Sequence, residues 1–517
     1  MVKEKNSYFF ADYIILILIS FYINYYYSNV GVLAQDTFAY YDTSFRILNG
    51  SVPFKDYWTV SGPFIDYLQA FIFYFLGVSW KNYIISGSIL NSLITILFYH
   101  SLIVFNQNKF SSLFYAACFS ILANPSMGVP FPDHFSTFFS LIGIFFFLFA
   151  IKNHKKIFWF LIPICFFFAF FCKQSPSSYI LIVLLISFCF YFFGYRKFSS
   201  IKYLAVSTIF CLVFFSIFII ENEINIKQFL YQYILFPQTI AEKRMNEYHF
   251  TFNSIFLQYK FIYVYLVPLI IITFINFKKN FFLQDKLFFY NLIAILLSII
   301  LIFHQSITKN FIFIFFLVPF LGSLIHASLS KSIKGKKFIV TFLVTLTIFI
   351  TTKYHLRFNE DRKMLNLENL NIKNNADSEL IHPSLKGLKW ITYTFPEAPI
   401  KEIELVKNSL ETIKNDKSKK MLLTDYLFFS SVLEENLHNP TRWPSLQDAS
   451  NPDTKNIYHS IYREFIKDLI ILKKIETLYT TVDNQGDIFL KIFDEKCLKT
   501  KEINDFLRKH DIKNCTK

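Results

Sequence analysis

The sequence predicts a polytopic α-helical membrane protein that carries an α/β domain outside the membrane at its C-terminal end. Of 517 residues, 54% are hydrophobic and only 17% are charged, whereas a soluble domain uses roughly 25% charged residues. The apolar residues form runs of about twenty over residues 1–353, which is the length that crosses a bilayer. From residue 354 to 517 the composition becomes mixed and polar. These patterns exclude a cytosolic enzyme, a disordered chain and a disulfide-rich scaffold.

The N-terminal apolar run is predicted to be retained as the first span. Tyr13–Val30 follows Lys3 and Lys5, is longer than the core of a signal peptide and has no small-residue cleavage site. Hydropathy windows add ten further segments. The eleven predicted spans cover residues 12–30, 82–105, 110–127, 133–151, 157–172, 177–194, 201–220, 258–277, 286–303, 309–328 and 337–353.

Basic residues give the predicted orientation, because Lys and Arg collect in cytoplasmic loops. With the N-terminus in the cytoplasm, the three short outer loops near 128–132, 173–176 and 304–308 carry only Lys173. An odd number of spans then places residues 354–517 outside the cytoplasm. The net charge of +15 is therefore explained by topology rather than by nucleic-acid binding, for which no motif is visible. The cytoplasmic segments carry Lys3, Lys5, Lys109, Lys152, Lys155, Lys156, Arg196, Lys197, Lys202, Lys278, Lys279, Lys286, Lys331, Lys334, Lys336 and Lys337.

The first outer loop, residues 31–81, is predicted to contain two helices. Apolar residues at helical spacing follow Asp36, so Thr37–Leu48 is expected to be an amphipathic helix that ends at Asn49-Gly50. A second apolar helix is expected over Phe64–Leu76, opened by Pro63 and closed by a glycine. Because this stretch is short for a span, we expect it to lie in the membrane interface.

The C-terminal domain is predicted to combine helices with short strands. Helices are expected over Glu402–Asn415 and Tyr458–Lys474, and a buried strand over Met421–Thr424. Two more strands, Ile475–Thr480 and Ile488–Ile492, are expected around the turn Asn484-Gln485-Gly486. Cys497 and Cys515 either form a disulfide in an oxidising compartment or stay free. The other five cysteines, Cys118, Cys165, Cys172, Cys189 and Cys211, lie in or near spans, where packing explains them.

Acidic residues at the predicted outer face are the first candidates for chemistry. Asp36 is either a catalytic carboxylate or the N-cap of the helix that follows it. Asp56, in the turn between the two loop helices, is a weaker candidate. Asp133 and His134 open the fourth span and either cap it or bind a cation there, because a carboxylate in an apolar bundle is costly without a partner.

Basic residues at the same face are the second set of candidates. Lys173 ends the fifth span against the positive-inside trend, so it either extends its ammonium group to the interface or holds a lipid phosphate. His304 is another basic residue at this face, in the loop before the tenth span. Lys243 and Arg244, in the outer segment after residue 220, are further basic candidates, with a plain surface position as the alternative.

The first loop resembles that of the GT-C glycosyltransferases, and most closely the branch with protein O-mannosyltransferases and lipid A aminoarabinose transferases. The likeness is carried by Asp36, the helix ending at Arg46–Gly50, the stretch Val52–Trp58, and Gly62-Pro63 before an aromatic helix. The Pro132-Asp133-His134 entry to the fourth span, the Lys173-Gln174 exit of the fifth, and His304 before an aromatic span with Pro319 are also similar.

The resemblance implies an inverting transferase that uses a polyprenyl-phosphate sugar at the outer face. By this likeness Asp36 is the general base, and Lys173, Arg244 and His304 hold the donor phosphate. Asp133 matches a second acidic position that helps to bind a divalent metal, such as Mg²⁺ or Mn²⁺, in some members. This chain lacks the Asp-Glu pair common in the branch, and it has His134 where a second carboxylate is expected, so the likeness leaves metal dependence open.

Three functions therefore remain on the sequence alone. The first is the transferase, acting on a glycan, lipid or protein acceptor at the periplasmic face of a bacterial inner membrane. The second is a transporter or flippase of lipid-linked glycans, which predicts basic residues within the spans instead of at one face. The third is a membrane scaffold that binds partners through the C-terminal domain, and it leaves the first-loop pattern unexplained.

Overall fold

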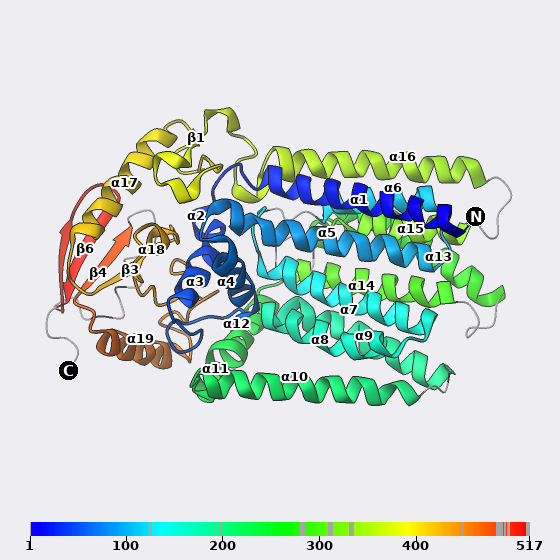
Figure 1. Ribbon diagram of the computed structural model, residues 1–517, viewed down its shortest axis with the longest axis horizontal. Helices are drawn as coiled ribbons and strands as arrows, with labels where there is room; N and C mark the ends of the chain where they lie inside the picture. Colours follow the sequence, from blue (N-terminus) through cyan, green and yellow to red (C-terminus); the bar gives the residue numbers. More distant parts are fainter. Residues whose placement is uncertain are drawn as a thin grey trace. The chain divides into compact units, whose positions relative to one another are not determined.

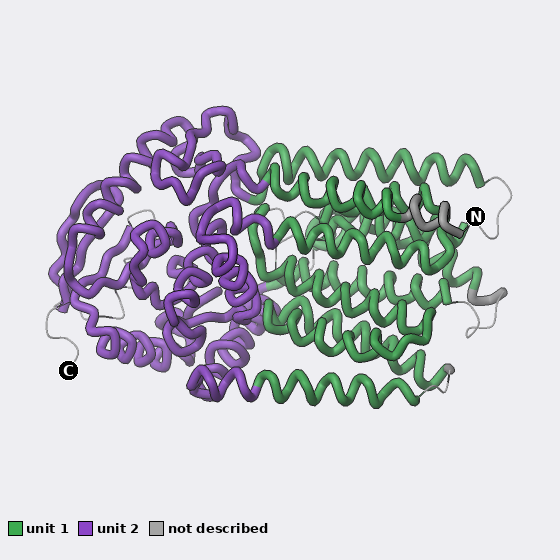
Figure 2. The backbone as a smooth tube through the Cα atoms, in the orientation of Figure 1, with its two compact units in different colours: residues 1–27, 87–215, 248–364 green, residues 28–86, 216–247, 365–517 purple. Residues whose placement is uncertain are grey.

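The computed structural model describes residues 2–123, 127–195, 198–249, 251–279, 286–308, 314–329, 336–446, 448–481, 490, 493 and 497–512. The chain forms two compact units (Figure 2). Unit 1 comprises residues 1–27, 87–215 and 248–364, and unit 2 comprises residues 28–86, 216–247 and 365–517. Unit 2 therefore contains the first outer loop together with the C-terminal part of the chain.

Unit 1 is a bundle of long helices that run side by side (Figure 1). Helices α5 and α10 each begin in one unit and end in the other. The helices of the bundle are α1 (Val2–Tyr27), α5 (Trp80–Val104), α6 (Lys109–Leu122), α7 (Pro132–Asn153), α8 (Lys156–Cys172), α9 (Gln174–Tyr195), α10 (Ile201–Glu221), α13 (Lys260–Lys279), α14 (Lys286–Thr308), α15 (Leu317–Leu329) and α16 (Lys336–His355).

Each of the eleven predicted spans corresponds to one of these helices. Seven helices of the described chain are long and apolar enough to cross a membrane, and the other predicted spans contain shorter apolar stretches. Hydrophobic side chains on α10 are mostly exposed, with only 11% of its apolar window buried, whereas α7 is 89% buried. An apolar helix surface of this kind is stable in lipid and not in water. The predicted class, a polytopic helical membrane protein with an α/β domain, is confirmed.

Two contacts inside unit 1 join predicted cytoplasmic segments in pairs. The Lys109 ammonium lies 3.1 Å from the carboxylate of Asp12, next to the N-terminal segment. Lys286 donates a hydrogen bond of 3.0 Å to the carbonyl of Ile151, near the end of α7. Each contact places two predicted cytoplasmic segments at the same end of the bundle, as the predicted alternation requires.

The first outer loop forms three helices in unit 2: α2 (Ala34–Thr37), α3 (Ala39–Leu48) and α4 (Phe64–Leu76). The bounds of α4 are those predicted. The expected single helix from residue 37 is instead divided at Phe38, whose φ of −108° and ψ of 6° are not helical. The turn at Gly77 has a φ of +84°, which a glycine adopts without strain.

The middle of unit 2 consists of α11 (Ile226–Leu230) and α12 (Phe236–Asn246), joined by a π-helical turn over Tyr231–Leu235. Phe236 belongs to a hydrophobic core with Trp58 of the first loop and with residues of α19. This core ties the middle segment, the first loop and the C-terminal part of unit 2 together.

The C-terminal part of unit 2 is built around a four-stranded sheet of order β3-β4-β6-β5. Strands β3 and β4 are parallel, and the other two pairs are antiparallel. A second, two-stranded sheet pairs β1 with β2. The elements are β1 (Ala376–Asp377), β2 (Lys389–Trp390), α17 (Pro399–Asn415), β3 (Lys420–Leu423), α18 (Phe429–Val432), α19 (His459–Lys473), β4 (Thr477–Thr481), β5 (Leu498–Glu502) and β6 (Leu507–Ile512).

The sequence predicted α17, α19, β3 and β4 to within a few residues, and it did not predict β5 and β6. The expected turn at residues 484–486 lies outside the described residues, as does the expected strand at 488–492 apart from Leu490. Cys497 is disulfide-bonded. The other cysteine of the C-terminal part, Cys515, lies outside the described residues.

Candidate functional site

Most of the predicted site residues lie in two clusters, one in each unit, together with residues that the sequence did not predict. The first-loop cluster, in unit 2, comprises Asp36, Tyr40, Asp66, Arg442 and Trp443. The bundle-end cluster, in unit 1, comprises Asp133, His134, Lys173, Tyr179 and His304.

Asp36 does not cap the helix that follows it. It lies inside α2, and the N-cap position of α3 is Phe38, which makes no side-chain capping bond. The hydroxyl of Thr37, one residue on, accepts a hydrogen bond of 2.9 Å from the backbone N–H of Leu33. The capping alternative for Asp36 is therefore wrong.

The half-buried carboxylate of Asp36 contacts the C-terminal part of the chain. Its Oδ1 accepts a hydrogen bond of 3.1 Å from the indole N–H of Trp443. Trp443 is 8% exposed, so this contact lies at the edge of a packed region. A carboxylate that is held by a neutral donor and is partly open keeps lone pairs with which it can accept a proton.

Arg442, next to this tryptophan, is fully buried beneath the first loop. Its guanidinium pairs with the carboxylate of Asp66 on α4 and donates to the hydroxyl of Ser61. It also lies 4.3 Å from the centre of the Tyr40 ring, a cation–π contact. Burial alone lowers the pKa of Arg442, but the adjacent Asp66 carboxylate raises it above its ordinary value. Arg442 therefore stays charged, and its contacts with Tyr40 and Asp66 fasten α3 and α4 to the C-terminal part.

Further bonds attach the first loop to the same C-terminal segment. Arg46 donates to the carbonyl of Asn439 at 2.7 Å, and the backbone N–H of Trp58 donates to the carbonyl of Pro440 at 2.7 Å. Asp56, a weaker candidate from the sequence, is buried and accepts from the backbone N–H of Val52 at 2.8 Å. These contacts give Asp56 a structural role in the turn.

The bundle-end cluster is centred on an ion pair between two neighbouring helices. Asp133, in the first turn of α7, lies 2.7 Å from the ammonium of Lys173, the C-cap residue of α8. The Asp133 side chain is 2% exposed and the Lys173 side chain 26% exposed. The carbonyl of Lys173 accepts from the hydroxyls of Ser136 and Ser177 at 2.9 and 2.8 Å. The cation is therefore held in place and is still partly open.

Two histidines adjoin this ion pair. His134 and His304 are both buried and lie within electrostatic range of the Asp133 carboxylate. The ring of His304, near the end of α14, lies 5.6 Å from that of Tyr179 on α9. Candidates that the sequence predicted separately on three spans thus meet at one end of the bundle, together with Tyr179 of α9.

The remaining basic candidates lie on α12 in unit 2. Lys243 forms a 2.6 Å ion pair with Asp448, in which the lysine side chain is exposed and the aspartate is half-buried. An exposed pair of this kind supports the surface interpretation of Lys243. Arg244 follows it and is half-buried.

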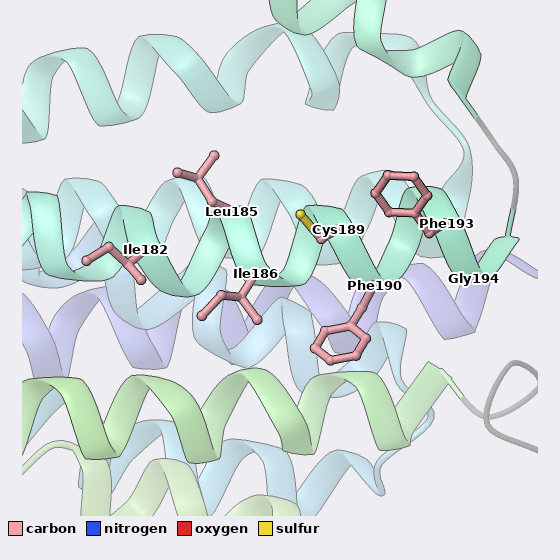
Figure 3. Close-up of a pocket in the computed structure, with 7 residues that line it drawn as sticks. All are labelled: Ile182, Leu185, Ile186, Cys189, Phe190, Phe193 and Gly194. Atoms are coloured by element: carbon pink, nitrogen blue, oxygen red, sulfur yellow. The ribbon is translucent and has the colours of Figure 1, made fainter.

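An apolar hollow of about 520 Å³ lies along α9 in unit 1 (Figure 3). All of its lining side chains are apolar apart from one cysteine thiol, so it offers no ligand for a phosphate or a sugar. In a membrane such a surface is covered by hydrocarbon chains. The lining residues are Ile182, Leu185, Ile186, Cys189, Phe190, Phe193 and Gly194.

The Asp133 carboxylate already pairs with the ammonium of Lys173. Within the described ranges there is no group of three or more His, Cys, Asp and Glu side chains that could hold a metal ion.

Sequence reasoning identified Asp36, Asp133, Lys173 and His304, but it missed Trp443 and Arg442. Both lie in an irregular segment with neither helical nor strand periodicity, about 400 positions along the chain from their partners. A tryptophan beside an arginine in a polar loop was the only local signal.

Comparisons with known proteins add one structural likeness. No family model and no curated protein sequence matches this chain. Among solved structures, the chain is similar to that of ArnT from Cupriavidus metallidurans bound to undecaprenyl phosphate. The sequences are 11% identical, the TM-score is 0.47, and the alignment covers 96% of this chain and 97% of that chain.

Proposed function

We propose that this protein is an inverting glycosyltransferase that moves a sugar from a polyprenyl-phosphate donor to an acceptor hydroxyl at the outer face of a membrane, the periplasmic face in a bacterium. The observation that carries the proposal is the state of Asp36. Its carboxylate is half-buried, caps no helix and is oriented by a tryptophan from a distant part of the chain. A side chain held in this way is suited to chemistry rather than to local structure.

Asp36 acts as the general base. As the acceptor oxygen attacks the anomeric carbon, Asp36 takes the hydroxyl proton, and the bond between that carbon and the donor phosphate breaks. Attack from the face opposite the leaving group inverts the anomeric centre.

Lys173 and His304 bind the donor phosphate, and Arg244 is a further candidate ligand. The leaving group is a phosphate that gains negative charge as the bond breaks, so cations lower the barrier more than a proton donor does. The ammonium of Lys173 is 26% exposed beside Asp133. This partial exposure lets it share its charge with an incoming phosphate.

The test is sugar transfer from labelled polyprenyl-phosphate donors in membranes that carry wild-type protein or Asp36→Asn. Loss of the base is expected to lower the transfer rate by about 10²–10⁴-fold. Expression and helix content should not change, because the Asp36 side chain caps no helix.

Asp377→Asn is the matched control, since Asp377 is a carboxylate of unit 2 with a 63% exposed side chain paired to Lys389 at the surface. It should transfer sugar at the wild-type rate. Equal rates in wild type and Asp36→Asn would contradict the base assignment. A wild-type protein that moves lipid-linked glycan across vesicles but transfers no sugar would favour the transporter instead.

A further inference from the structure

We infer that Trp443 is a positioning residue for Asp36, so that the C-terminal part of the chain completes the catalytic centre. The inference rests on the proposed function, because it concerns the residue that acts there as the base. It depends on the 3.1 Å hydrogen bond from the Trp443 indole to Asp36 Oδ1, and on how both residues are held.

Trp443 is held by hydrogen bonds to its backbone carbonyl and by contacts of its ring with two neighbouring side chains. Its backbone carbonyl accepts hydrogen bonds from the hydroxyl of Ser450 at 2.5 Å and from the amide of Asn451 at 3.1 Å. Its ring meets the Tyr40 ring edge-on, with ring centres 6.3 Å apart. Arg442, the preceding residue, lies 5.4 Å from the centre of the indole ring and pairs with the buried Asp66. The indole N–H therefore has little freedom to turn away from Asp36.

The backbone leading to Asp36 is held by the same part of the chain. The N–H of Gly31 donates to the carbonyl of Lys389 at 3.0 Å, and the N–H of Val32 donates to the carbonyl of Ile391 at 2.9 Å. The N–H of Lys389 in turn donates to the carbonyl of Asn29 at 2.7 Å. Strand-like pairing thus fixes the backbone before α2, while Trp443 fixes the carboxylate.

A residue that orients a general base affects the chemical step more than it affects substrate binding. Without the indole donor, the Asp36 side chain loses a hydrogen bond that orients it, and fewer bound complexes have the base within reach of the acceptor proton. Trp443→Phe keeps most of the ring and removes the N–H. We expect it to lower kcat by about 10–100-fold and to leave the KM for the donor within about twofold.

The hydrogen bond can be observed without any enzymatic assay. The chain has five tryptophans, so protein labelled with ¹⁵N at the indole nitrogens gives five indole N–H resonances. Trp443→Phe removes and thereby identifies one of them. Asp36→Ala, which removes the acceptor, is expected to shift that resonance, and the four remaining signals report whether each variant is folded.

Trp390 provides the matched control in the same unit. Its indole N–H donates to the buried carboxylate of Glu402 at 2.9 Å, so Trp390→Phe removes an equivalent bond that does not involve Asp36. Trp390→Phe should leave kcat unchanged, and its resonance should not move in Asp36→Ala.

Three outcomes decide the inference. A shift of the Trp443 resonance in Asp36→Ala, together with a loss of kcat confined to Trp443→Phe, supports it. An unmoved Trp443 resonance overturns it, and so do equal losses in the two tryptophan variants. If wild-type protein transfers no sugar from any donor, the proposed function fails, and the resonance still shows whether Trp443 holds Asp36.

Discussion

At the residue scale, the pair of Asp133 and Lys173 combines a structural role with the proposed role of Lys173 in binding phosphate. Asp133 is almost completely buried, and a buried carboxylate is costly without a cation beside it. The positive charge of Lys173 offsets that cost, and its partly exposed ammonium can also face a phosphate. Removing Lys173 alone therefore has two effects, which a simple activity assay would not separate.

A pair of variants separates these effects. Lys173→Met leaves Asp133 buried without its cation and is expected to lower the free energy of unfolding by about 3–5 kcal/mol. Adding Asp133→Asn removes the uncompensated charge, so the double variant should regain most of that stability. It should not regain the affinity for the donor, because the cation is still missing. Thermal unfolding in detergent and the KM for the donor give the two readouts, and recovery of both would show that Lys173 does not bind phosphate.

At the element scale, local signals predicted helices well and the sheet poorly. The bounds of α4 follow from Pro63 before it and Gly77 after it, and hydropathy alone located each helix of the bundle. Strand β5 (Leu498–Glu502) has four exposed residues among its five and shows no apolar alternation, so it carries no signal of its own. It exists because it pairs with β6, a tertiary effect that periodicity cannot report.

The same limit applies to the candidate site. The residue types at the helix ends made Asp133, Lys173 and His304 visible, because polar groups are rare next to apolar spans. The partner of Asp36 was not visible, since no rule of spacing links positions 36 and 443. The sequence therefore predicted the candidate groups, whereas only the fold indicates what orients one of them.

The C-terminal end of strand β3 provides a prediction about pH. Asp425, two residues beyond the strand, is buried, and burial raises the pKa of its carboxyl from 3.8 to about 6. The folded state therefore binds this proton more tightly than the unfolded state does. The resulting stability is complete below about pH 4 and is lost as the pH rises through about 6. A rise of this size corresponds to ~3 kcal/mol.

Asp425→Asn has no charge to bury, so it should unfold at a higher temperature than wild type at pH 8 and at nearly the same temperature at pH 4. The measurement is the unfolding midpoint of both proteins in detergent between these pH values. Other buried carboxyls, such as Glu402, contribute equally to both curves, so only the difference between the proteins is informative. A constant difference across the range would show that Asp425 keeps an ordinary pKa.

At the scale of the whole molecule, segments that are far apart in the sequence form one compact unit. Residues 28–86 share a compact unit with residues 365–517, although several spans separate them along the chain. Both segments must therefore lie on the same side of the membrane. This requirement agrees with the predicted topology, in which an even number of crossings separates the first loop from the C-terminal domain.

The topology predicts which surfaces a membrane-impermeant reagent can reach. Lys401 is exposed on α17 in the C-terminal domain, and Lys155 is exposed in the turn between α7 and α8, a predicted cytoplasmic loop. Lys401→Cys and Lys155→Cys are each made in a background of Cys189→Ser. In intact cells, a membrane-impermeant maleimide should modify the cysteine at position 401. It should modify position 155 only after the membrane is opened. Labelling of both positions in intact cells would mean that the span count is wrong. Labelling of position 155 alone in intact cells would place Asp36 and the proposed transfer reaction in the cytoplasm.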